Sequence, residues 1–353
     1  MKAVYLAGRG LACSLGLNVR ASVIALRSDV GLTSLHSCSG APGSGFTYRS
    51  IDDSQSDWKE RARGLIQRVA REAGAQHARC GVLFIATTSF DIGAVEQGTT
   101  GMNYNVFADM IAAWLAWAGP VFVVSTACTS SLNAMMAAHA LLRSGLVQDA
   151  LVLGVELSNR LTLDGFAALQ LLSSGRSQPF GKDRDGLVLG EAVAALRLSS
   201  RENGIWQMLG GANVVDGKQP TSASASAVVS MYQSALAHCG LAADAIDLIK
   251  VQAAGSHGND AIEAQGLRDM FHVIPPLVSL KSAIGHAMGA AGAAEIALLT
   301  ACLEHGVWPT YGHAVDETLG VKLAAHVPVS VRRVMATILG FGGGHSTVVL
   351  KRA

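Results

Sequence analysis

The stretch that decides the fold is residues 121–138, VFVVSTACTSSLNAMMAA. Its first four residues predict a buried strand, and residues 130–138 have the composition and spacing of a helix. Cys128 lies between the two. Unpaired amides in the first turn of a helix stabilise a thiolate, so we expect the pKa of this thiol to lie below its free value of about 8.5. A buried cysteine that packs only as a small apolar residue is the alternative, and the local sequence leaves both open.

Composition bounds the class of protein. The chain has 353 residues, of which 50% are hydrophobic and 15% are charged, so it is long enough to bury a large core. Its 27 Lys and Arg residues nearly balance 26 Asp and Glu residues, and a net charge of +1 gives no electrostatic signature of nucleic-acid or anionic-membrane binding. We therefore expect any partner to be recognised through local patches.

The cysteines indicate the compartment. They lie at positions 13, 38, 80, 128, 239 and 302, without a CxxC motif or paired spacing, which argues against a zinc site and a disulfide framework. The N-terminal apolar run is too short for a signal peptide, and no uninterrupted apolar stretch of about 18 residues occurs. We expect a cytoplasmic protein that does not insert into a membrane.

Strand and helix patterns alternate along the chain. Buried strands are predicted at residues 81–86, 121–124, 150–155, 192–198 and 246–252, and helices at 57–74, 130–144, 227–239, 260–270 and 291–306. This alternation is typical of an α/β fold with parallel strands covered on both faces. A polar joint near residues 199–204 predicts two similar halves, residues 1–200 with Cys128 and residues 201–353.

Four further segments carry polar residues where a core does not need them. They are residues 179–191 (PFGKDRDGLVLGE), 253–260 (AAGSHGND), 281–292 (KSAIGHAMGAAG) and 340–345 (GFGGGH). Taken singly, each has an ordinary interpretation, because a lone Lys or His is usually a surface or satisfied polar residue and glycine loops usually only turn the chain. Their order along the chain and their spacing relative to Cys128 make the set more specific than any one segment.

Together these segments resemble the β-ketoacyl-acyl carrier protein synthases, condensing enzymes of the thiolase fold. The resemblance begins at residues 4–10 (VYLAGRG) and 13–16 (CSLG) and extends to the last glycine loop, so it covers nearly the whole chain. It implies two fused βαβαβ halves that form a five-layered αβαβα sandwich. It also implies a dimer whose interface runs beside the nucleophile.

The resemblance assigns catalytic roles. Cys128 matches the residue that takes an acyl chain from a carrier protein as a thioester. The backbone amides of Cys128 and Phe341 match the oxyanion hole, and Phe341 also matches a gate on the malonyl side. His286 matches a histidine that donates to the thioester carbonyl, Lys281 matches the lysine beside it, and Glu191 matches a buried acid that partners this network.

Other positions are expected to bind substrate. Phe166 lies where the family has a phenylalanine facing the acyl pocket, and Ser256 can offer a hydroxyl to pantetheine. Gly342 and Gly343 belong to the glycine loop. This chemistry requires no cofactor and no metal, because phosphopantetheine arrives on the carrier protein.

The chain departs from the family at one catalytic position. The family's first histidine lies in an Ala-His-Gly-Thr-Gly-Thr run, whose matching residues here place Ala254 at the histidine, in a loop about two residues shorter. Loss of such a donor typically costs about 10²- to 10³-fold in rate. His257 follows three residues later and could swing in. His345 replaces an asparagine common after the glycine loop.

Three functions therefore stay open. The favoured one is a chain-length-factor-like subunit of a type II fatty-acid, polyketide or aryl-polyene system, acting beside a complete ketosynthase as a heterodimer. The alternatives are a self-sufficient synthase, as a homodimer, and a non-catalytic scaffold for acyl carrier proteins. Basic patches for the carrier are sought at Lys59, Arg61 and Arg63 or near Arg143, which could equally be solvated helix faces.

Two other enzyme classes fit less well. A thiolase needs a second cysteine in the last glycine loop, where this chain has Gly343, Gly344 and His345. A serine hydrolase needs a Gly-x-Ser-x-Gly elbow, which residues 40–45 do not provide.

Overall fold

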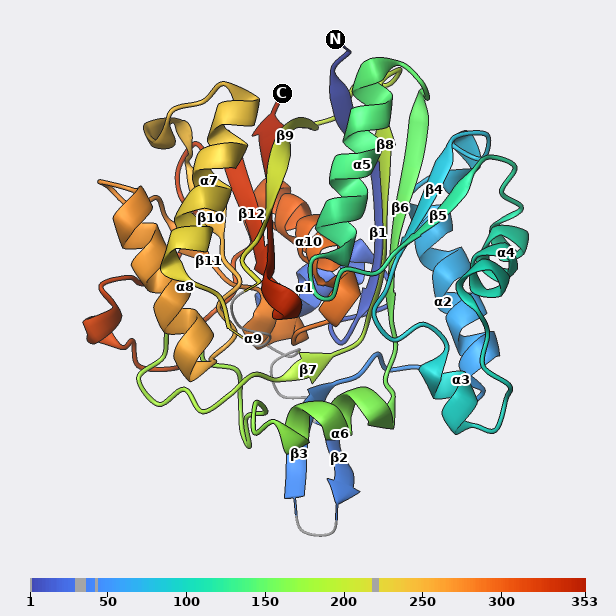
Figure 1. The fold of residues 1–353 in the computed structure, drawn as a ribbon, viewed down its shortest axis with the longest axis horizontal. Helices are drawn as coiled ribbons and strands as arrows, with labels where there is room; N and C mark the ends of the chain where they lie inside the picture. The colour runs from blue at the N-terminus through green and yellow to red at the C-terminus, as the bar shows by residue number, and fades with distance from the viewer. Residues whose placement is uncertain (1, 29–35, 42–43, 218–221) are drawn as a thin grey trace.

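A computed structural model describes residues 2–28, 36–41, 44–217 and 222–353. Ten strands follow one another in a continuous hydrogen-bonded order, β11-β10-β12-β13-β9-β1-β8-β6-β4-β5 (Figure 1). The strands of the first half are β1 (Val4–Cys13), β4 (Val82–Ala86), β5 (Val121–Val124), β6 (Asp149–Glu156) and β8 (Ala192–Ser199). Those of the second half are β9 (Trp206–Val215), β10 (Leu248–Lys250), β11 (Leu277–Val278), β12 (Arg333–Leu339) and β13 (Gly344–Arg352).

The two halves repeat one topology. In the first half, β1 and β8 pair antiparallel, β8 and β6 pair antiparallel, and β6, β4 and β5 run parallel. In the second half, β9 and β13, then β13 and β12, pair antiparallel, and β12, β10 and β11 run parallel. The halves are joined where β1 meets β9, with Val4 opposite Met208. This repeat supports a division near residue 200, which stays a proposal.

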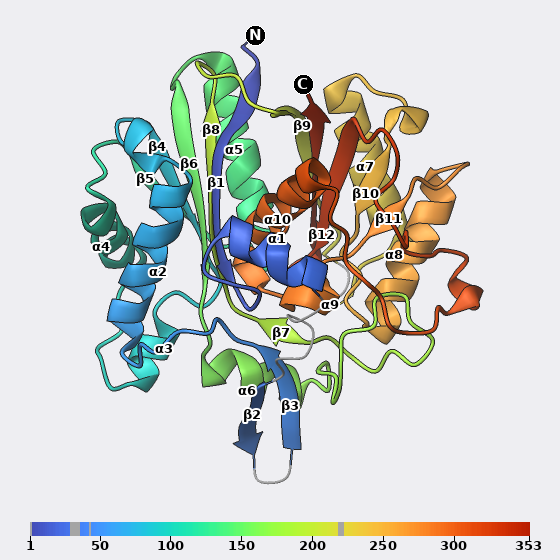
Figure 2. The same ribbon diagram turned by 180° about the vertical axis from the view of Figure 1, so that it is seen from behind.

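Helices form three layers around the two sets of strands. Helices α2 (Trp58–Glu72) and α4 (Tyr104–Leu115) cover the outer face of the first set, and α7 (Ala225–Cys239) and α8 (His257–Met270) cover that of the second (Figure 1). Helices α5 (Ser130–Ser144) and α10 (Ala291–His305) lie between the sets, as the view from behind also shows (Figure 2). The expected αβαβα sandwich of the thiolase fold is confirmed.

The sequence of α10 explains its central place. Every residue from 291 to 303 is buried, so the helix has no polar face to turn toward water. Gly292 lets it approach α5 closely, because a Cβ at this position would lie 2.7 Å from side-chain carbons of Leu132. Small residues therefore set the distance between the two central helices.

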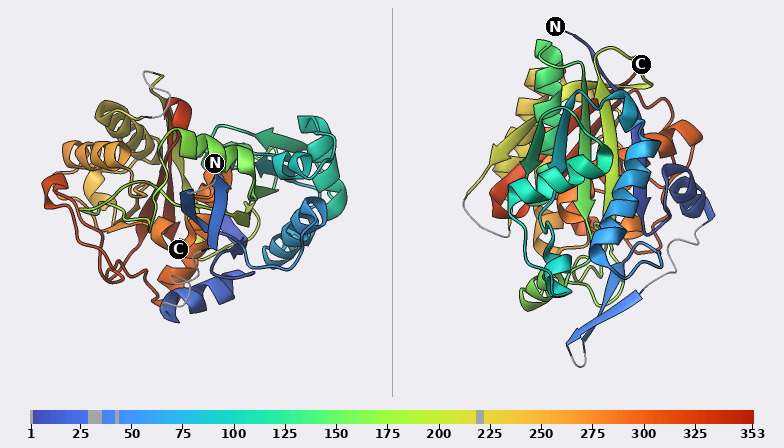
Figure 3. Two further views of the ribbon diagram at one scale, coloured as in Figure 1. Left: turned by 90° about the horizontal axis from the view of Figure 1, so that it is seen from below. Right: turned by 90° about the vertical axis from the view of Figure 1, so that its right-hand side faces the viewer.

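The remaining elements gather at one end of the molecule. Strands β2 (His36–Ala41) and β3 (Ser44–Arg49) form a hairpin that pairs with β7 (Leu189–Gly190) and projects beside α6 (Arg160–Ala168) (Figure 3). The other α-helices of the described residues are α1 (Val19–Ser28), α3 (Ile92–Glu96) and α9 (Lys281–Ile284). Among the described residues, none of the helices has the length and apolar content needed to cross a bilayer.

Candidate active site

Cys128 lies in a sharp turn between β5 and α5. Ala127 adopts a left-handed conformation with φ of 52°, which turns the chain from the strand into the helix. Ser130 fixes this turn, because its Oγ accepts from the Thr126 amide at 2.9 Å and donates to the Ala127 carbonyl at 2.6 Å. Cys128 is only 2% exposed. The turn therefore holds the thiol in one place beneath the surface.

His286 lies directly against this thiol. Its Nε2 atom is 2.9 Å from the Cys128 Sγ, across a sequence separation of 158 residues. Its backbone is fixed from both sides, since the His286 amide donates to the Val188 carbonyl and its carbonyl accepts from the Gly190 amide. The ring's Nδ1 atom is buried and has no partner among the described residues. The structure thus brings together two expected catalytic residues from opposite halves of the chain.

The electrostatics of the thiol correct one expectation. Desolvation raises the pKa of Cys128 to about 11, although the backbone amides of Phe341 and Cys128 and the charge of Lys281 lower it. The expected depressed pKa is therefore wrong for the free protein, because burial outweighs the helix terminus. The two amides that act on the sulfur are the same two that were expected to form the oxyanion hole.

His286 is held neutral. Desolvation, followed by the charges of Lys281 and Lys250, lowers its pKa well below the ordinary value. At neutral pH the pair is therefore a thiol beside an uncharged imidazole. An uncharged imidazole can accept the thiol proton as the sulfur attacks an electrophile, so the thiolate forms only during the reaction.

A buried ionic cluster lies behind His286. Both Lys281 and Lys250 donate to the Glu295 carboxylate, Lys281 to Oε1 and Lys250 to Oε2 at 2.5 Å, and all three side chains are at most 1% exposed. Burial would raise the pKa of Glu295, but the two ammonium groups hold it below its ordinary range. The cluster carries one net positive charge toward the Cys128 and His286 pair.

A small cavity lies over the thiol. Phe166 and Phe341 cover it with stacked rings, whose centroids are 5.4 Å apart at an interplanar angle of 15°. The enclosed volume is only about 20 Å³. The cavity is lined by Cys128, Phe166, Leu187, Gln252, Ala254, Ser256, Asn259, Asp260, Glu263, His286, Leu339 and Phe341. The rings must move before a thioester can reach the sulfur.

Comparison with known proteins agrees with this geometry. Residues 74–203 match the family described as beta-ketoacyl synthase, N-terminal domain, and residues 208–314 match its C-terminal domain. The chain belongs to the β-ketoacyl synthase family. Among the described residues of this β-ketoacyl synthase chain, no group of three or more His, Cys, Asp or Glu side chains could hold a metal ion.

Its relatives are varied in architecture. A phenolphthiocerol synthesis polyketide synthase type I of Mycobacterium marinum is 33% identical over 64% of this chain, which spans 12% of that protein. The chloroplastic 3-oxoacyl-acyl-carrier-protein synthase II of Arabidopsis thaliana is 28% identical over 69% of this chain, which spans 50% of that enzyme. The chain therefore covers half or less of the length of these curated relatives.

Solved structures match over the whole chain. One is a ketosynthase in complex with its chain length factor from Xenorhabdus doucetiae, with a TM-score of 0.85, 25% identity and coverage of 100% of this chain and 98% of that one. Another is a type II polyketide synthase acyl-carrier protein in complex with its ketosynthase, with a TM-score of 0.87, 20% identity and full coverage of both chains. The second likeness shows the fold alone.

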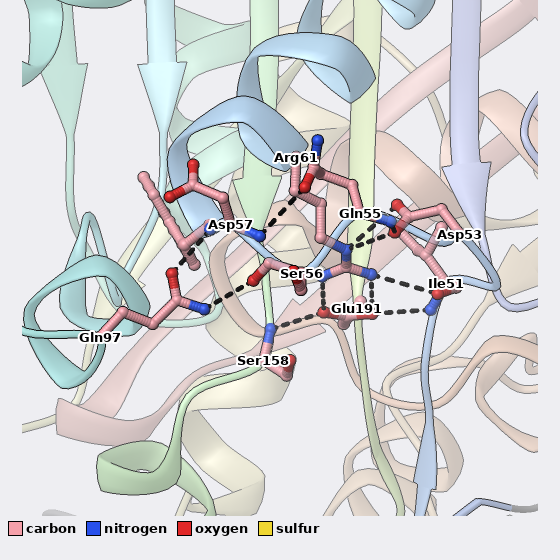
Figure 4. Close-up of polar contacts among 10 residues, drawn as sticks. Ile51, Asp53, Gln55, Ser56, Asp57, Arg61, Gln97, Ser158 and Glu191 are labelled. Atoms are coloured by element: carbon pink, nitrogen blue, oxygen red, sulfur yellow. Dashed lines mark hydrogen bonds and ion pairs between the residues drawn. The ribbon is translucent and has the colours of Figure 1, made fainter.

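Within this β-ketoacyl synthase fold, Glu191 does not partner Lys281 or His286. Its fully buried carboxylate accepts from Arg61 at 2.6 and 2.9 Å and from the amides of Ile51 and Ser158 at 2.7 Å (Figure 4). Burial alone would raise its pKa, but Arg61 and the amides hold it below the ordinary range. The expectation is wrong because Glu191, between β7 and β8, turns its side chain toward Arg61 of α2.

Glu295 takes the place expected of Glu191. The sequence motifs did not indicate Glu295, because this residue lies outside the glycine-rich segments that carry them. One signal was present, since Glu295 is the single acid within the apolar run of residues 291–303. A carboxylate in such a helix must find buried cations or stay uncharged.

Arg61 does not have the exposed side chain that its expected role in a carrier-binding patch requires. It is largely buried and pairs with Asp53 as well as Glu191 (Figure 4). By contrast, Lys59 and Arg63 are exposed on α2. The proposed patch at this helix loses its central residue. The arginine instead anchors residues 51–57 to α2.

The substrate-binding expectations divide into two groups. Phe166 and Ser256 line the cavity, whereas His257, Gly342 and Gly343 are not among its lining residues. His257 is exposed at the start of α8. Gly342 and Gly343 have φ of 78° and 77°, so they provide the left-handed turn that positions Phe341.

Ala254 stands where the resemblance leads us to expect a histidine. It is 4% exposed and lines the cavity with Cys128 and His286. Asp260 fixes this loop, since its carboxylate accepts from the amides of Ala254, Gly255 and Ser256. A movement of His257 into the cavity would break this arrangement, so the structure gives that rescue no support.

Proposed function

We propose that this chain is a ketosynthase-family subunit for decarboxylative condensation of acyl thioesters with malonyl-acyl carrier protein, acting as a chain-length-factor-like partner of a complete ketosynthase. One observation carries the proposal. The cavity holds the Cys128 thiol and His286 in contact, but has Ala254 where a second histidine is expected. A methyl group cannot polarise a carbonyl, so half of the expected polar contact to malonyl thioester is missing.

The geometry suits acyl loading. The Cys128 sulfur attacks the carrier thioester while His286 takes its proton, and the amides of Cys128 and Phe341 receive the oxyanion of the tetrahedral intermediate. Collapse of the intermediate breaks the bond to pantetheine, whose sulfur leaves with the proton from His286. Loading therefore uses only groups that this chain contains.

The open edge of β5 supports a dimer. Within the described residues, β5 pairs only with β4, and Phe122 on this strand is 50% exposed. Tyr104 and Val106 on the neighbouring α4 are 61% and 48% exposed. An unpaired strand edge beside exposed apolar side chains is a surface for a second subunit. The complexes named above, of a ketosynthase with a chain length factor and with an acyl-carrier protein, favour the same assembly here.

The partner is proposed to be a complete ketosynthase, with a homodimer as the alternative. The contact between His286 and Cys128 favours a second function, a self-sufficient synthase, because an inert subunit has no need of a preserved nucleophile pair. A scaffold that only binds carrier proteins is the third. A cytoplasmic location stays a prediction from the cysteine pattern.

One experiment separates the three functions. The purified chain is incubated with acyl and malonyl carrier proteins, alone and with a complete ketosynthase, and both condensation product and the mass of Cys128 are measured. Our proposal expects product only with the partner. Product from the chain alone would establish the self-sufficient synthase, and an unmodified Cys128 in every mixture would favour the scaffold. A Cys128→Ala variant is the control for acylation at other thiols.

A further inference from the structure

We propose that Gln252 contacts the acyl thioester that enters the Cys128 cavity and donates to its carbonyl during acyl loading. This inference rests on the proposed function, because it requires that a thioester enters the cavity. Gln252 is a neutral residue and would act only by hydrogen bonding.

The first observation is an unused polar group. Gln252 lines the same cavity as Cys128, His286 and Ala254. It is 9% exposed, and its side-chain oxygen has no hydrogen-bond partner among the described residues. Buried polar groups in folded proteins are nearly always paired. Because no hydrogen bond from the described residues holds the Gln252 oxygen in place, the carboxamide is free to rotate and can turn its N–H donors toward a ligand in the cavity.

The second observation is a rigid backbone. The amides of Gln252 and Ala253 both donate to the Glu263 carboxylate at 2.7 Å, and the Ala254 carbonyl accepts from Ser177 at 2.7 Å. The main chain around Gln252 is therefore held by its own partners. Its side chain extends from a fixed segment, which is the arrangement required to orient a substrate.

The two carboxylates that line the cavity are less suited to this contact. Asp260 and Glu263 line the cavity, but their carboxylates already accept from backbone amides. Burial also raises the pKa of Glu263 to about 7, which reflects the cost of a charge at this place. A neutral carboxamide avoids that cost.

The chemistry of a carboxamide fits a thioester. It has two N–H donors and one acceptor, and rotation of the group can turn either end toward the ligand. Its N–H donates to the thioester carbonyl and to the oxygen that becomes negative as the carbonyl is attacked. No bond to Gln252 forms and no proton leaves it, so it stabilises charge without acting as an acid or a base.

The test compares matched variants of the full chain. Gln252→Leu keeps the size and removes all polar groups, whereas Gln252→Glu keeps the shape and the acceptors but removes the N–H donors. Gln148→Leu, at an exposed position just before β6, is the control. The measured quantity is the second-order rate constant for acylation of Cys128, followed by mass spectrometry. The probes are an acyl carrier protein thioester and the corresponding N-acetylcysteamine thioester, which needs no carrier docking.

We expect both Gln252 variants to acylate about 10- to 100-fold more slowly than the wild type, and the control to be unchanged. Alkylation of Cys128 by iodoacetamide should stay at the wild-type rate in Gln252→Leu, since this substitution leaves the thiol intact and adds no charge beside it. Equal acylation of wild type and both variants overturns the inference and leaves the proposed function standing.

The small thioester separates the two hypotheses. If only this probe acylates the wild type, and the Gln252 variants lose that reaction, the carrier part of the proposed function fails and the role of Gln252 stands. If neither probe acylates a thiol that iodoacetamide modifies, both the proposed function and the role of Gln252 are overturned.

Discussion

The Nε2 atom of His286 lies 2.9 Å from the Sγ atom of Cys128, and both side chains are buried. Burial disfavours charge on either partner, so the pair rests as a neutral thiol and a neutral imidazole. The reaction therefore starts with the thiol proton in the hydrogen bond between the sulfur and the imidazole nitrogen. Reactivity must come from the electrophile that enters, and four predictions test this picture and the ionic groups around it.

The first prediction concerns pH. Because the pKa of Cys128 is raised to about 11, the thiolate fraction at neutral pH is small and increases as pH rises. We expect the iodoacetamide rate at Cys128 to increase about tenfold per pH unit up to that value. Mass spectrometry of the modified peptide measures it, with the exposed Cys80 as an internal reference. A plateau near pH 8.5 would contradict a desolvated thiol.

The second prediction separates the two lysines. Lys281 lowers the pKa of Cys128, so Lys281→Met should raise that pKa further and slow alkylation at any given pH. Lys250→Met is the matched variant, because it also leaves one lysine on Glu295. We expect Lys250→Met to have the smaller effect on alkylation. Equal slowing by both substitutions would mean that the net charge of the cluster matters more than its position.

The third prediction concerns stability of the cluster. Glu295→Gln leaves two buried ammonium groups without a carboxylate, and breaking a buried ion pair in this way typically costs about 3–5 kcal/mol. Urea unfolding of the variant should show this loss. Glu60→Gln, at an exposed position of α2, should change the free energy of unfolding by no more than about 0.5 kcal/mol. A stable Glu295→Gln protein would require that the lysines become neutral.

The fourth prediction concerns Arg61 and Glu191. Arg61→Met leaves the Glu191 carboxylate buried without its cation and should cost about 3–5 kcal/mol, whereas the exposed Arg63→Met should cost little. The pKa of Glu191 is lowered in the folded protein, so its stabilising contribution is present above the ordinary carboxyl pKa. That contribution is lost as pH falls through the lowered value.

The pH dependence distinguishes this pair from simple packing. Unfolding of the wild type should show an acid limb below about pH 4.5, the ordinary range of a glutamate, that Arg61→Met diminishes. An acid limb of equal size in both proteins would show that other carboxylates dominate.

Local patterns were enough to predict an α/β fold, whereas the αβαβα sandwich was implied by the family resemblance. Apolar and small residues dominate the strand at residues 121–124, the helix that follows it and α10. This composition alone predicts that these elements are buried. Sequence reasoning also reached Cys128, His286 and Lys281, since each lies in a recognisable segment. The contact between Cys128 and His286 depends on the fold, and the resemblance predicted that both residues serve one site without predicting that their side chains touch.

The wrong predictions concern the role of Glu191, which depends on the direction of its side chain, and the pKa of Cys128, which depends on the exclusion of solvent. Glu191 follows Gly190, whose amide binds the His286 carbonyl, but the glutamate side chain faces Arg61 instead. The pKa of Cys128 depends on how completely the surrounding layers exclude water, which no local pattern states. Gln252 was not considered at all, because a single amide after a strand has no distinctive spacing.

The pairing of β1 with both β8 and β9 has a consequence for synthesis. Cys13 finds its partner in Ala192, and Val4 finds its partner in Met208, so both neighbours of β1 lie far downstream in the chain. At about 5–20 residues per second, a ribosome needs about 10–40 s to make the intervening segment. During that time an apolar strand has two unpaired edges, and we expect it to depend on chaperones until the centre of the molecule closes around it.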